Sequence, residues 1–368
     1  MQGVSLGIDI QTSHIDIYAV HQKQFCSIDI PGQKQNNRID IDFSSSTNNY
    51  VFNKKTPIDF NANFIPYELI WGVEKQSVDP FFLHTFPEHF IFDNNKCIGL
   101  ETFNEPLLFH TIFQNYFKLL SQTIYKQLAK PVTTINLHAP EHQSSFLKNI
   151  LKTLLENSFN CKVTPRSSKN IILQQSASTD IPQKKQVHLF TNYTKPYLYY
   201  HNVKTNELYY HLFTQNIYRL DLAFLEKLKH QFIKSIAPYN VSFNAYQRNQ
   251  LFYAASHIRH GLNQHHTLKA FIPALCYSNE YGLHDFNFNI QRDEYGQFVQ
   301  QNSSVFLKEM DAFFLKNKIL PHDINSLYLH GEGLNVPGLA TVLAHYFQKP
   351  KETIVADPTF VTQHCINF

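Results

Sequence analysis

Residues 7–20 read GIDIQTSHIDIYAV and predict a pair of strands near the start of the chain. Gly7–Ile10 is apolar enough for a buried strand, and residues 11–14 are the polar residues of a tight turn. Residues 15–20 then alternate between apolar and polar side chains, which is the period of a second strand. We therefore expect two strands joined by a short turn.

The C-terminal part of the chain has a second informative pattern, a strand followed by a glycine-containing turn and a helix. Residues 327–330 predict the strand, 331–335 the turn and 336–347 the helix. Further helices are expected at 105–128, 144–156, 220–236, 245–262 and 303–317, and further strands at 132–137, 161–163, 187–190, 197–201, 208–212 and within 268–290. In each half of the chain, predicted strands are followed by predicted helices in a similar order, which indicates an α/β protein. The polar stretch 180–185 breaks the pattern and predicts the boundary between the two halves.

The composition limits what the protein can be. Hydrophobic residues make up 43% of the 368 residues and charged residues 17%, so a packed core is expected and wholesale disorder is excluded. The formal net charge of +3 gives no electrostatic support for nucleic-acid binding. We find no apolar run long enough to cross a membrane and no signal peptide, so no membrane partner is expected. Five scattered cysteines without a CxxC pair suit a reducing compartment, and we expect a cytoplasmic protein.

Five segments of the chain are similar, in the same order, to segments of one known family. PVTTINLHAP at 131–140 is similar to PVxxAVITVPAYF, and IILQQSAST at 171–179 is similar to IINEPTAAA. Residues 324–347 are similar to DIxxVILVGGxxRxPxVQxxVxxFF, and VADPTFVTQHC at 355–365 is similar to NPDEAVAxGAA. With the hairpin GIDIQTSHIDIYAV, these segments resemble the nucleotide-binding domain of DnaK-type heat-shock chaperones, members of the actin-like ATPase superfamily. Residues 67–72 faintly resemble a region of the specialised chaperone of iron–sulphur cluster assembly.

The resemblance implies the actin-like ATPase fold, in which two lobes each contain a core sheet, helices and a smaller peripheral subdomain. Lobe I would span residues 1–184, with its peripheral subdomain at about 38–104. Lobe II would span residues 185–368, with its peripheral subdomain at about 225–300. We expect no peptide-binding domain of the kind that follows the lobes in these chaperones.

The resemblance also implies where ATP and Mg²⁺ would lie. Asp9, Thr12 and Ser13 stand where the phosphate hairpin has its metal-linked aspartate and two threonines. Arg259 stands where a basic residue contacts the ribose, and Gly331 where the adenosine loop has a glycine. These five residues are the expected remnant of a nucleotide site, and we assign no catalytic residue and no direct metal ligand.

Most other site residues of the family are replaced. Neutral or bulky residues stand where the phosphate glycines, the lysine, the glutamate and the aspartates are expected: Gln11, Tyr67, Gln174, Thr191, Tyr193, Thr194, Lys195, Leu198 and Thr359. Pro196 removes an amide donor from the second phosphate loop, and Glu332 adds an acid beside the expected nucleotide. Only 11 of 368 residues are glycine, which agrees with the loss of phosphate-binding loops. We expect that ATP hydrolysis is lost and that ATP and Mg²⁺ bind weakly at most.

Three functions remain open on the sequence alone. The first is a non-catalytic binding or assembly module, for which family analogy implies a J-domain co-chaperone or an iron–sulphur scaffold as the protein partner. The second is a divergent ATPase that still binds ATP through the remnant residues and moves its lobes. The third is a component of a larger complex that uses the fold only as structure. The run Asp9–Thr12 can equally form a β-turn whose polar side chains bond the backbone. For Gly331 and Pro337 the sequence favours the end of a strand and the start of a helix over a contact with adenine.

Metal and nucleophile sites are disfavoured. The densest histidine group comprises His257, His260, His265 and His266. Histidines three apart share a helix face that can bind a metal, but with 20 histidines in the chain a chance cluster is the simpler interpretation. The same holds for His138 and His142. No GxSxG elbow accompanies a serine, and no cysteine lies in an evidently electropositive setting, so nucleophilic hydrolysis is also disfavoured.

Overall fold

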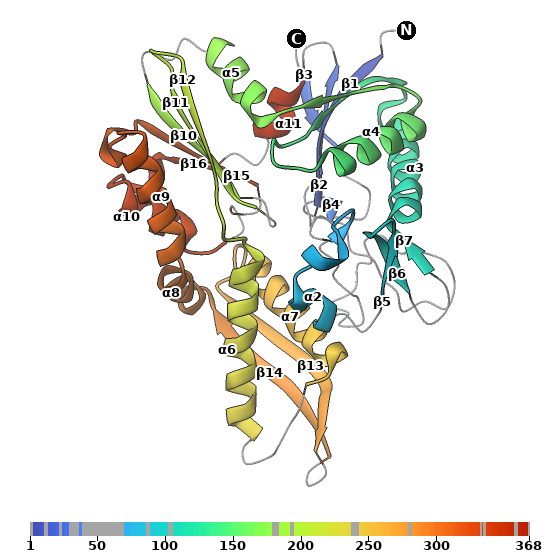
Figure 1. Ribbon diagram of the computed structural model, residues 1–368, viewed down its shortest axis with the longest axis vertical. Helices are drawn as coiled ribbons and strands as arrows, with labels where there is room; N and C mark the ends of the chain where they lie inside the picture. Colours follow the sequence, from blue (N-terminus) through green and yellow to red (C-terminus); the bar gives the residue numbers. More distant parts are fainter. Residues whose placement is uncertain are drawn as a thin grey trace. The chain divides into compact units, whose positions relative to one another are not determined.

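The computed structural model describes most of the chain as helices, strands and short connections (Figure 1). The described residues are 3–10, 14–21, 24–28, 37–38, 70–85, 89–101, 106–178, 184–191, 195–236, 243–278, 282–331, 333, 336–356 and 360–366. The chain divides into two compact units. The first unit comprises Met1–His84, Glu88–Asp180 and Thr359–Phe368, and the second comprises Thr85–Pro87 and Ile181–Pro358.

The boundary between the units lies near the predicted one, but the last residues of the chain depart from the prediction. The chain passes from the first unit to the second at residues 180 and 181, whereas the predicted lobes meet at 184 and 185. Thr359–Phe368 belongs to the first unit, although the sequence assigned it to the second lobe. The reason is the packing of α11 (Phe360–Cys365) against β1 (Val4–Ile10), where a side chain at Gly7 would overlap the backbone carbonyl of α11.

The first unit is built on a sheet with the strand order β3-β2-β1-β8-β9. β1 pairs antiparallel with β2 (His14–His21), and β2 pairs antiparallel with β3 (Gln24–Ser27). On its other side β1 pairs parallel with β8 (Val132–His138), which pairs parallel with β9 (Lys162–Arg166). The two residues of β4 (Asn37–Arg38) also pair with β2. The strand pair predicted from GIDIQTSHIDIYAV is confirmed.

Three longer helices accompany this sheet: α3 (Phe109–Leu128), α4 (Ser145–Phe159) and α5 (Ser168–Ser178). α3 buries one apolar stripe, which confirms the helix predicted there: Phe109, Ile112, Phe113, Tyr116, Phe117, Leu120 and Ile124. α4 begins after Ser144, whose hydroxyl accepts a hydrogen bond from the amide of Leu147 and so caps the helix.

A smaller antiparallel sheet of β5 (His89–Asp93), β6 (Lys96–Glu101) and β7 (Pro106–Leu108) also belongs to the first unit. It follows the short helices η1 (Lys75–Ser77) and α2 (Pro80–Thr85). β7 lies just beyond the predicted end of the peripheral subdomain at about residue 104 and occupies the expected start of the long helix. Residues 39–69 of that subdomain lie outside the described residues.

The second unit repeats the plan of the first sheet. Its strands are β10 (Lys185–Phe190), β11 (Tyr197–Asn202), β12 (Glu207–Leu212), β15 (Ser326–His330) and β16 (Ile354–Ala356). They are ordered β12-β11-β10-β15-β16, with antiparallel pairs before β10 and parallel pairs after it. The order and the directions are therefore those of β3-β2-β1-β8-β9, and the predicted α/β class with two similar halves is confirmed.

The helices and the hairpin of the second unit include the region predicted as its peripheral subdomain. They are α6 (Tyr218–Ile236), α7 (Ala245–Gly261), β13 (Thr267–Ser278), β14 (Gly282–Gln291), α8 (Arg292–Asn302), α9 (Ser304–Lys316), η2 (Pro321–Asp323), α10 (Leu339–Tyr346) and η4 (Lys351–Thr353). α7 begins at a capping box, in which Asn244 and Gln247 each bond the other's backbone amide. Of these elements, α8 was not expected from the sequence.

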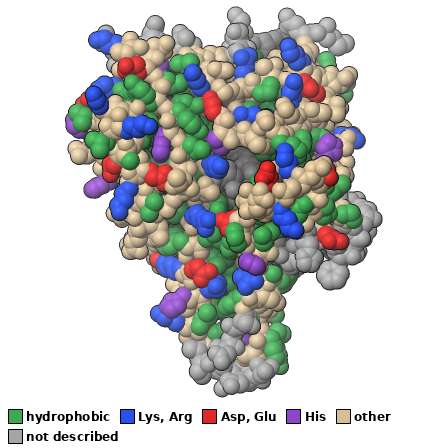
Figure 2. Space-filling view, viewed as in Figure 1, with side chains coloured by type: hydrophobic (Ala, Val, Ile, Leu, Met, Phe, Trp, Pro, Cys, Tyr) green, Lys and Arg blue, Asp and Glu red, His purple; other side chains and the backbone are tan. Residues whose placement is uncertain are grey.

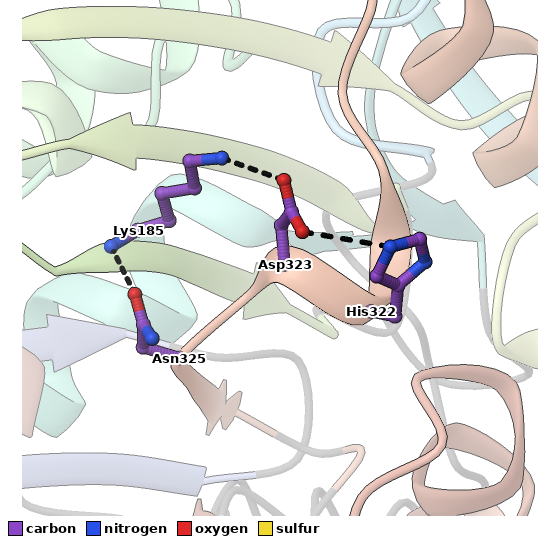
Figure 3. A network of polar contacts seen from close by, with 4 residues as sticks. All are labelled: Lys185, His322, Asp323 and Asn325. Carbon is purple, nitrogen blue, oxygen red and sulfur yellow. Dashed lines mark hydrogen bonds and ion pairs between the residues drawn. The ribbon is translucent and has the colours of Figure 1, made fainter.

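A polar network fixes the start of the second sheet (Figure 3). The Nζ atom of Lys185 lies 2.8 Å from Oδ2 of Asp323, and its backbone amide donates to Oδ1 of Asn325 over 2.8 Å. Oδ1 of Asp323 faces the ring of His322 at 3.5 Å. The first residue of β10 is thereby joined to the segment that leads into β15, its parallel neighbour.

The visible surface carries both signs of charge. On the face drawn in Figure 2, lysine and arginine side chains are interspersed with aspartate and glutamate. On that face the described basic side chains do not gather into a one-sided stripe. Within the described residues, none of the helices combines the length and the apolar character that a bilayer crossing requires.

Candidate functional site

Asp9, the predicted metal-linked residue, lies near the end of β1 beside the last residue of β8. Its Oδ1 atom is 2.7 Å from Nδ1 of His138. Both side chains are buried, with 6% of Asp9 and 4% of His138 exposed. β1 and β8 run parallel, so their carboxyl ends meet at one edge of the sheet, the edge at which α/β proteins place their ligand sites.

His138 continues the contact to Ser168, the first residue of α5. Its Nε2 atom lies 2.8 Å from Oγ of Ser168, whose side chain is 0% exposed. A carboxylate can only accept, so Nδ1 of His138 donates to Asp9, and in the neutral ring Nε2 accepts from the Ser168 hydroxyl. One hydrogen-bonded chain, Asp9–His138–Ser168, thus connects two strands and a helix of the first unit.

The order of these three side chains is that of the serine-hydrolase triad, which is recognised by geometry rather than by sequence position. A nucleophile must also be reached by its substrate, and the Ser168 hydroxyl is enclosed. The chain is therefore a structural connection in this conformation. Sequence reasoning considered His138 only as a metal ligand and missed its contact with Asp9. The available signal was that each residue lies at or near the end of a largely apolar strand.

The surroundings of Asp9 are closed by α11 and by polar groups of β8 and β9. Burial, together with the nearby Asp9 carboxylate, raises the pKa of the Cys365 thiol far above its ordinary value. Arg166, whose charge acts in the opposite direction, donates from Nε to Oδ1 of Asn136 over 3.2 Å. Cys365 is a free thiol and is buried, as are Cys97 and Cys276.

These residues do not fit a Mg²⁺ site. Magnesium prefers six oxygen ligands, several of them water, around one or two carboxylates. Asp9 instead bonds an imidazole that also contacts a serine hydroxyl, and its carboxylate raises the pKa of the buried Cys365 thiol. Thr12 and Ser13 lie outside the described residues. Across the described part of the chain, histidines, cysteines and carboxylates form no group of three suited to a metal ion.

In the second unit, aromatic and hydroxyl side chains lie at the corresponding sheet edge. Phe190 ends β10 and pairs with His330, the end of β15, with 4.6 Å between the ring centroids. The hydroxyl of Thr191 donates to the carbonyl of His330 over 2.7 Å and accepts from the amide of Gly333 over 2.6 Å. A side chain on Gly333 would overlap Thr191. Thr191, expected as a lost aspartate, therefore ties the strand end to the turn.

A second buried histidine lies behind this edge. Nδ1 of His188 is 3.2 Å from Nε2 of His330, and Nε2 of His188 is 3.3 Å from Oε1 of Gln186. The amide oxygen can only accept, so His188 donates to Gln186 and accepts from His330. The stacked ring of Tyr328, 4.6 Å from that of His188, completes a core network. Sequence reasoning did not identify it.

Gly331 follows β15 with a φ of 78°, a left-handed conformation that favours glycine. It ends the strand, in agreement with the structural interpretation of this glycine. Its expected contact with adenosine stays a prediction, as does the effect of Glu332, which lies outside the described residues.

Arg259, the predicted ribose contact, lies in the interior of the second unit. Its Nε atom is 2.9 Å from Oδ1 of Asp221, and both side chains are 0% exposed. Asp221 comes from α6 and Arg259 from α7. Burial, followed by the effect of the Asp221 carboxylate, raises the pKa of the hydroxyl of Tyr295 on α8. In this conformation Arg259 is a core residue, and its expected contact with a ribose stays a prediction.

The histidine group near the end of α7 does not converge. His257 and His260 are half-buried, whereas His265 and His266 are exposed beyond the helix end. Nδ1 of His260 donates to the carbonyl of Ser256 over 2.9 Å, a contact within the helix. These positions agree with the interpretation of a chance cluster.

Comparison with known proteins leaves the family open. No model of a protein family matches the sequence, and no curated protein matches it either. The inference about function therefore rests on the residues and on the fold.

Proposed function

We propose that the chain has the actin-like ATPase fold and works in the cytoplasm as a non-hydrolysing binding module related to the nucleotide-binding domain of DnaK-type chaperones. The support for the fold is the repetition of one five-stranded order, β3-β2-β1-β8-β9 and β12-β11-β10-β15-β16, with the same strand directions. A duplicated core sheet is what the resemblance implies for the two lobes.

The 2.7 Å contact between Asp9 and His138 is the single observation that carries the loss of catalysis. Phosphoryl transfer in an ATPase depends on metal ions that neutralise charge on the phosphates, and carboxylates hold those ions. Asp9 is the carboxylate expected to do so, and it is buried and bonded to an imidazole instead. The function proposed for Asp9 is to join β1 to β8 and, through His138, to α5.

The second unit adds an independent argument. Its expected phosphate loop starts at Thr191, which bonds the backbone of its own unit, beside the aromatic ring of Phe190. Neither side chain carries a charge that could bind a metal-linked phosphate. Pro196, buried at the start of β11, also has no amide proton to offer an anion.

A module of this kind acts through its partner. We propose a protein partner, and the resemblance points to a J-domain co-chaperone or an iron–sulphur assembly factor. The competing function is a divergent ATPase that still cycles its lobes, which the retained Asp9 and the left-handed Gly331 favour. The two functions differ in one measurable property, the affinity for Mg-ATP.

The test is thermal unfolding with and without millimolar Mg-ATP, combined with an assay for released phosphate. A ligand at a hundred times its dissociation constant stabilises the folded state by about 2.7 kcal/mol, a shift of several degrees. We expect no shift and no phosphate release above buffer. A clear shift that Asp9→Asn removes would overturn the proposal and support the ATPase.

The matched control is Asp16→Asn, because Asp16 pairs with Asp9 across β1 and β2. If both variants change a Mg-ATP response equally, the response reports general charge rather than a site at Asp9. Capture of a J-domain protein or an iron–sulphur scaffold by the intact chain would support the partner, and loss of that complex on adding Mg-ATP would favour the cycling alternative.

A further inference from the structure

The second unit contains a cavity of ≈ 780 Å³ between α8, the start of α9 and α10. This volume lies within the range of about 300–1,000 Å³ that is typical of small-molecule sites. All its lining residues belong to the second unit, and none is among the predicted nucleotide residues. The cavity is therefore a separate feature from the edges of the two core sheets.

Two glycines form the contact between α8 and α10 beside the cavity. A Cβ atom at Gly338 would lie 2.9 Å from the Cα atom of Gly296. Gly338 also has a φ of 87°, which favours glycine independently of the contact. Glycine at both positions leaves this part of the helix interface without side chains.

The cavity lining combines a larger apolar surface with several hydrogen-bonding side chains. On α8 the lining side chains include Arg292, Gln297 and Gln300, and on α10 they include Thr341 and His345. These side chains provide hydrogen-bond donors to a bound molecule.

The charges favour an anion. Arg292 and Lys351 line the cavity, and within the described residues neither has an ion-pair partner. Asp293 is the one acid among the described lining residues. A guanidinium binds phosphate through two parallel hydrogen bonds, and an ammonium adds a second positive charge. A phosphate monoester carries about −1.5 to −2 at neutral pH, which matches these two cations.

We infer that this cavity binds a small phosphorylated organic molecule, with its phosphate at Arg292 and Lys351. The apolar side chains of Leu307 and Val342, which also line the cavity, would contact the organic part. The volume is sufficient for one small molecule. The site does not depend on the proposed loss of ATP hydrolysis.

Isothermal titration of the full chain tests the inference, with phenyl phosphate and glucose 6-phosphate as probes and glucose as the uncharged control. We expect at least one phosphate ester to bind and glucose not to bind. Arg292→Gln and Lys351→Gln should each weaken binding roughly tenfold, since each removes a charged hydrogen bond. Asp293→Asn should strengthen binding severalfold.

Lys308→Gln is the matched control, because Lys308 is an exposed lysine of α9 outside the cavity. Asp9→Asn, in the other unit, separates this site from any nucleotide site and should leave phosphate-ester binding unchanged. Circular dichroism of each variant confirms that it is folded. The inference is overturned if neither ester binds at millimolar concentration, or if Lys308→Gln weakens binding as much as Arg292→Gln does.

Discussion

The buried ion pair between Arg259 and Asp221 gives the sharpest prediction about stability. The pair is 2.9 Å long and both side chains are 0% exposed. Asp221→Asn leaves a buried guanidinium without its charged partner, and Arg259→Met leaves a buried carboxylate. Removing one member of such a pair typically costs 3–5 kcal/mol, about the range expected for each variant.

The assay is thermal unfolding followed by circular dichroism. For a unit of about 150–250 residues, each kcal/mol lowers Tm by about 2–4 °C, so we expect a decrease of roughly 6–20 °C. The matched control is Glu294→Gln, which breaks the 2.7 Å pair with Lys227, whose side chain is 31% exposed against 42% for Glu294. That exposed pair should contribute less than about 1 kcal/mol.

The double variant Arg259→Met with Asp221→Leu separates charge from packing. Two apolar residues of similar volume should recover most of the loss, since a buried pair often contributes little beyond its own desolvation. Two results would refute the reasoning. One is an Asp221→Asn protein as stable as the Glu294→Gln control, and the other is an Arg259→Met protein of unchanged stability that has lost a measurable affinity for Mg-ATP.

Three further predictions follow from local contacts. Gly7→Ala should destabilise the first unit by about 1–3 kcal/mol in chemical denaturation, because the methyl group overlaps α11; an unchanged midpoint would contradict that packing. The hydrogen bond from Lys185 lowers the pKa of Asp323. The contribution of this contact to the free energy of unfolding is therefore complete above the ordinary carboxyl pKa and is lost as the pH falls through the lowered pKa. The difference in stability between the unaltered protein and Asp323→Asn should shrink only in acid. Burial raises the pKa of Cys365, so this thiol should stay unlabelled by maleimide until the protein unfolds, whereas the half-buried Cys161, with its pKa raised to about 11, should react sooner.

The sequence predicts most of the large elements because their periodicity is strong. The apolar stripe of α3 and the alternation of β2 are examples, and both lie where they were expected. α8 was missed because Gly296 and several polar residues interrupt its pattern, and only three of its residues, Tyr295, Phe298 and Val299, are buried. The short β16 and α11 carry too few residues for a period to be visible.

The candidate site was less predictable because it depends on pairing between distant strands. Asp9 and His138 are 129 residues apart and meet because β1 and β8 are parallel neighbours in one register. A side chain's hydropathy does not specify that register. Arg259 was assigned by its likeness to a family position, whereas its environment is set by α6, which supplies Asp221. Resemblance located the strand ends, and the structure supplied the contacts made there.

The return of α11 to the first unit has a consequence for how the protein is made. Ribosomes synthesise residues 360–365 only after Ile181–Pro358, so the N-terminal unit lacks part of its core until the other unit has emerged. Domains commonly fold in the order of synthesis, N-terminal first. Here the first unit cannot complete its fold until α11 is synthesised and packs against β1, so the second unit is the one that can complete its fold first.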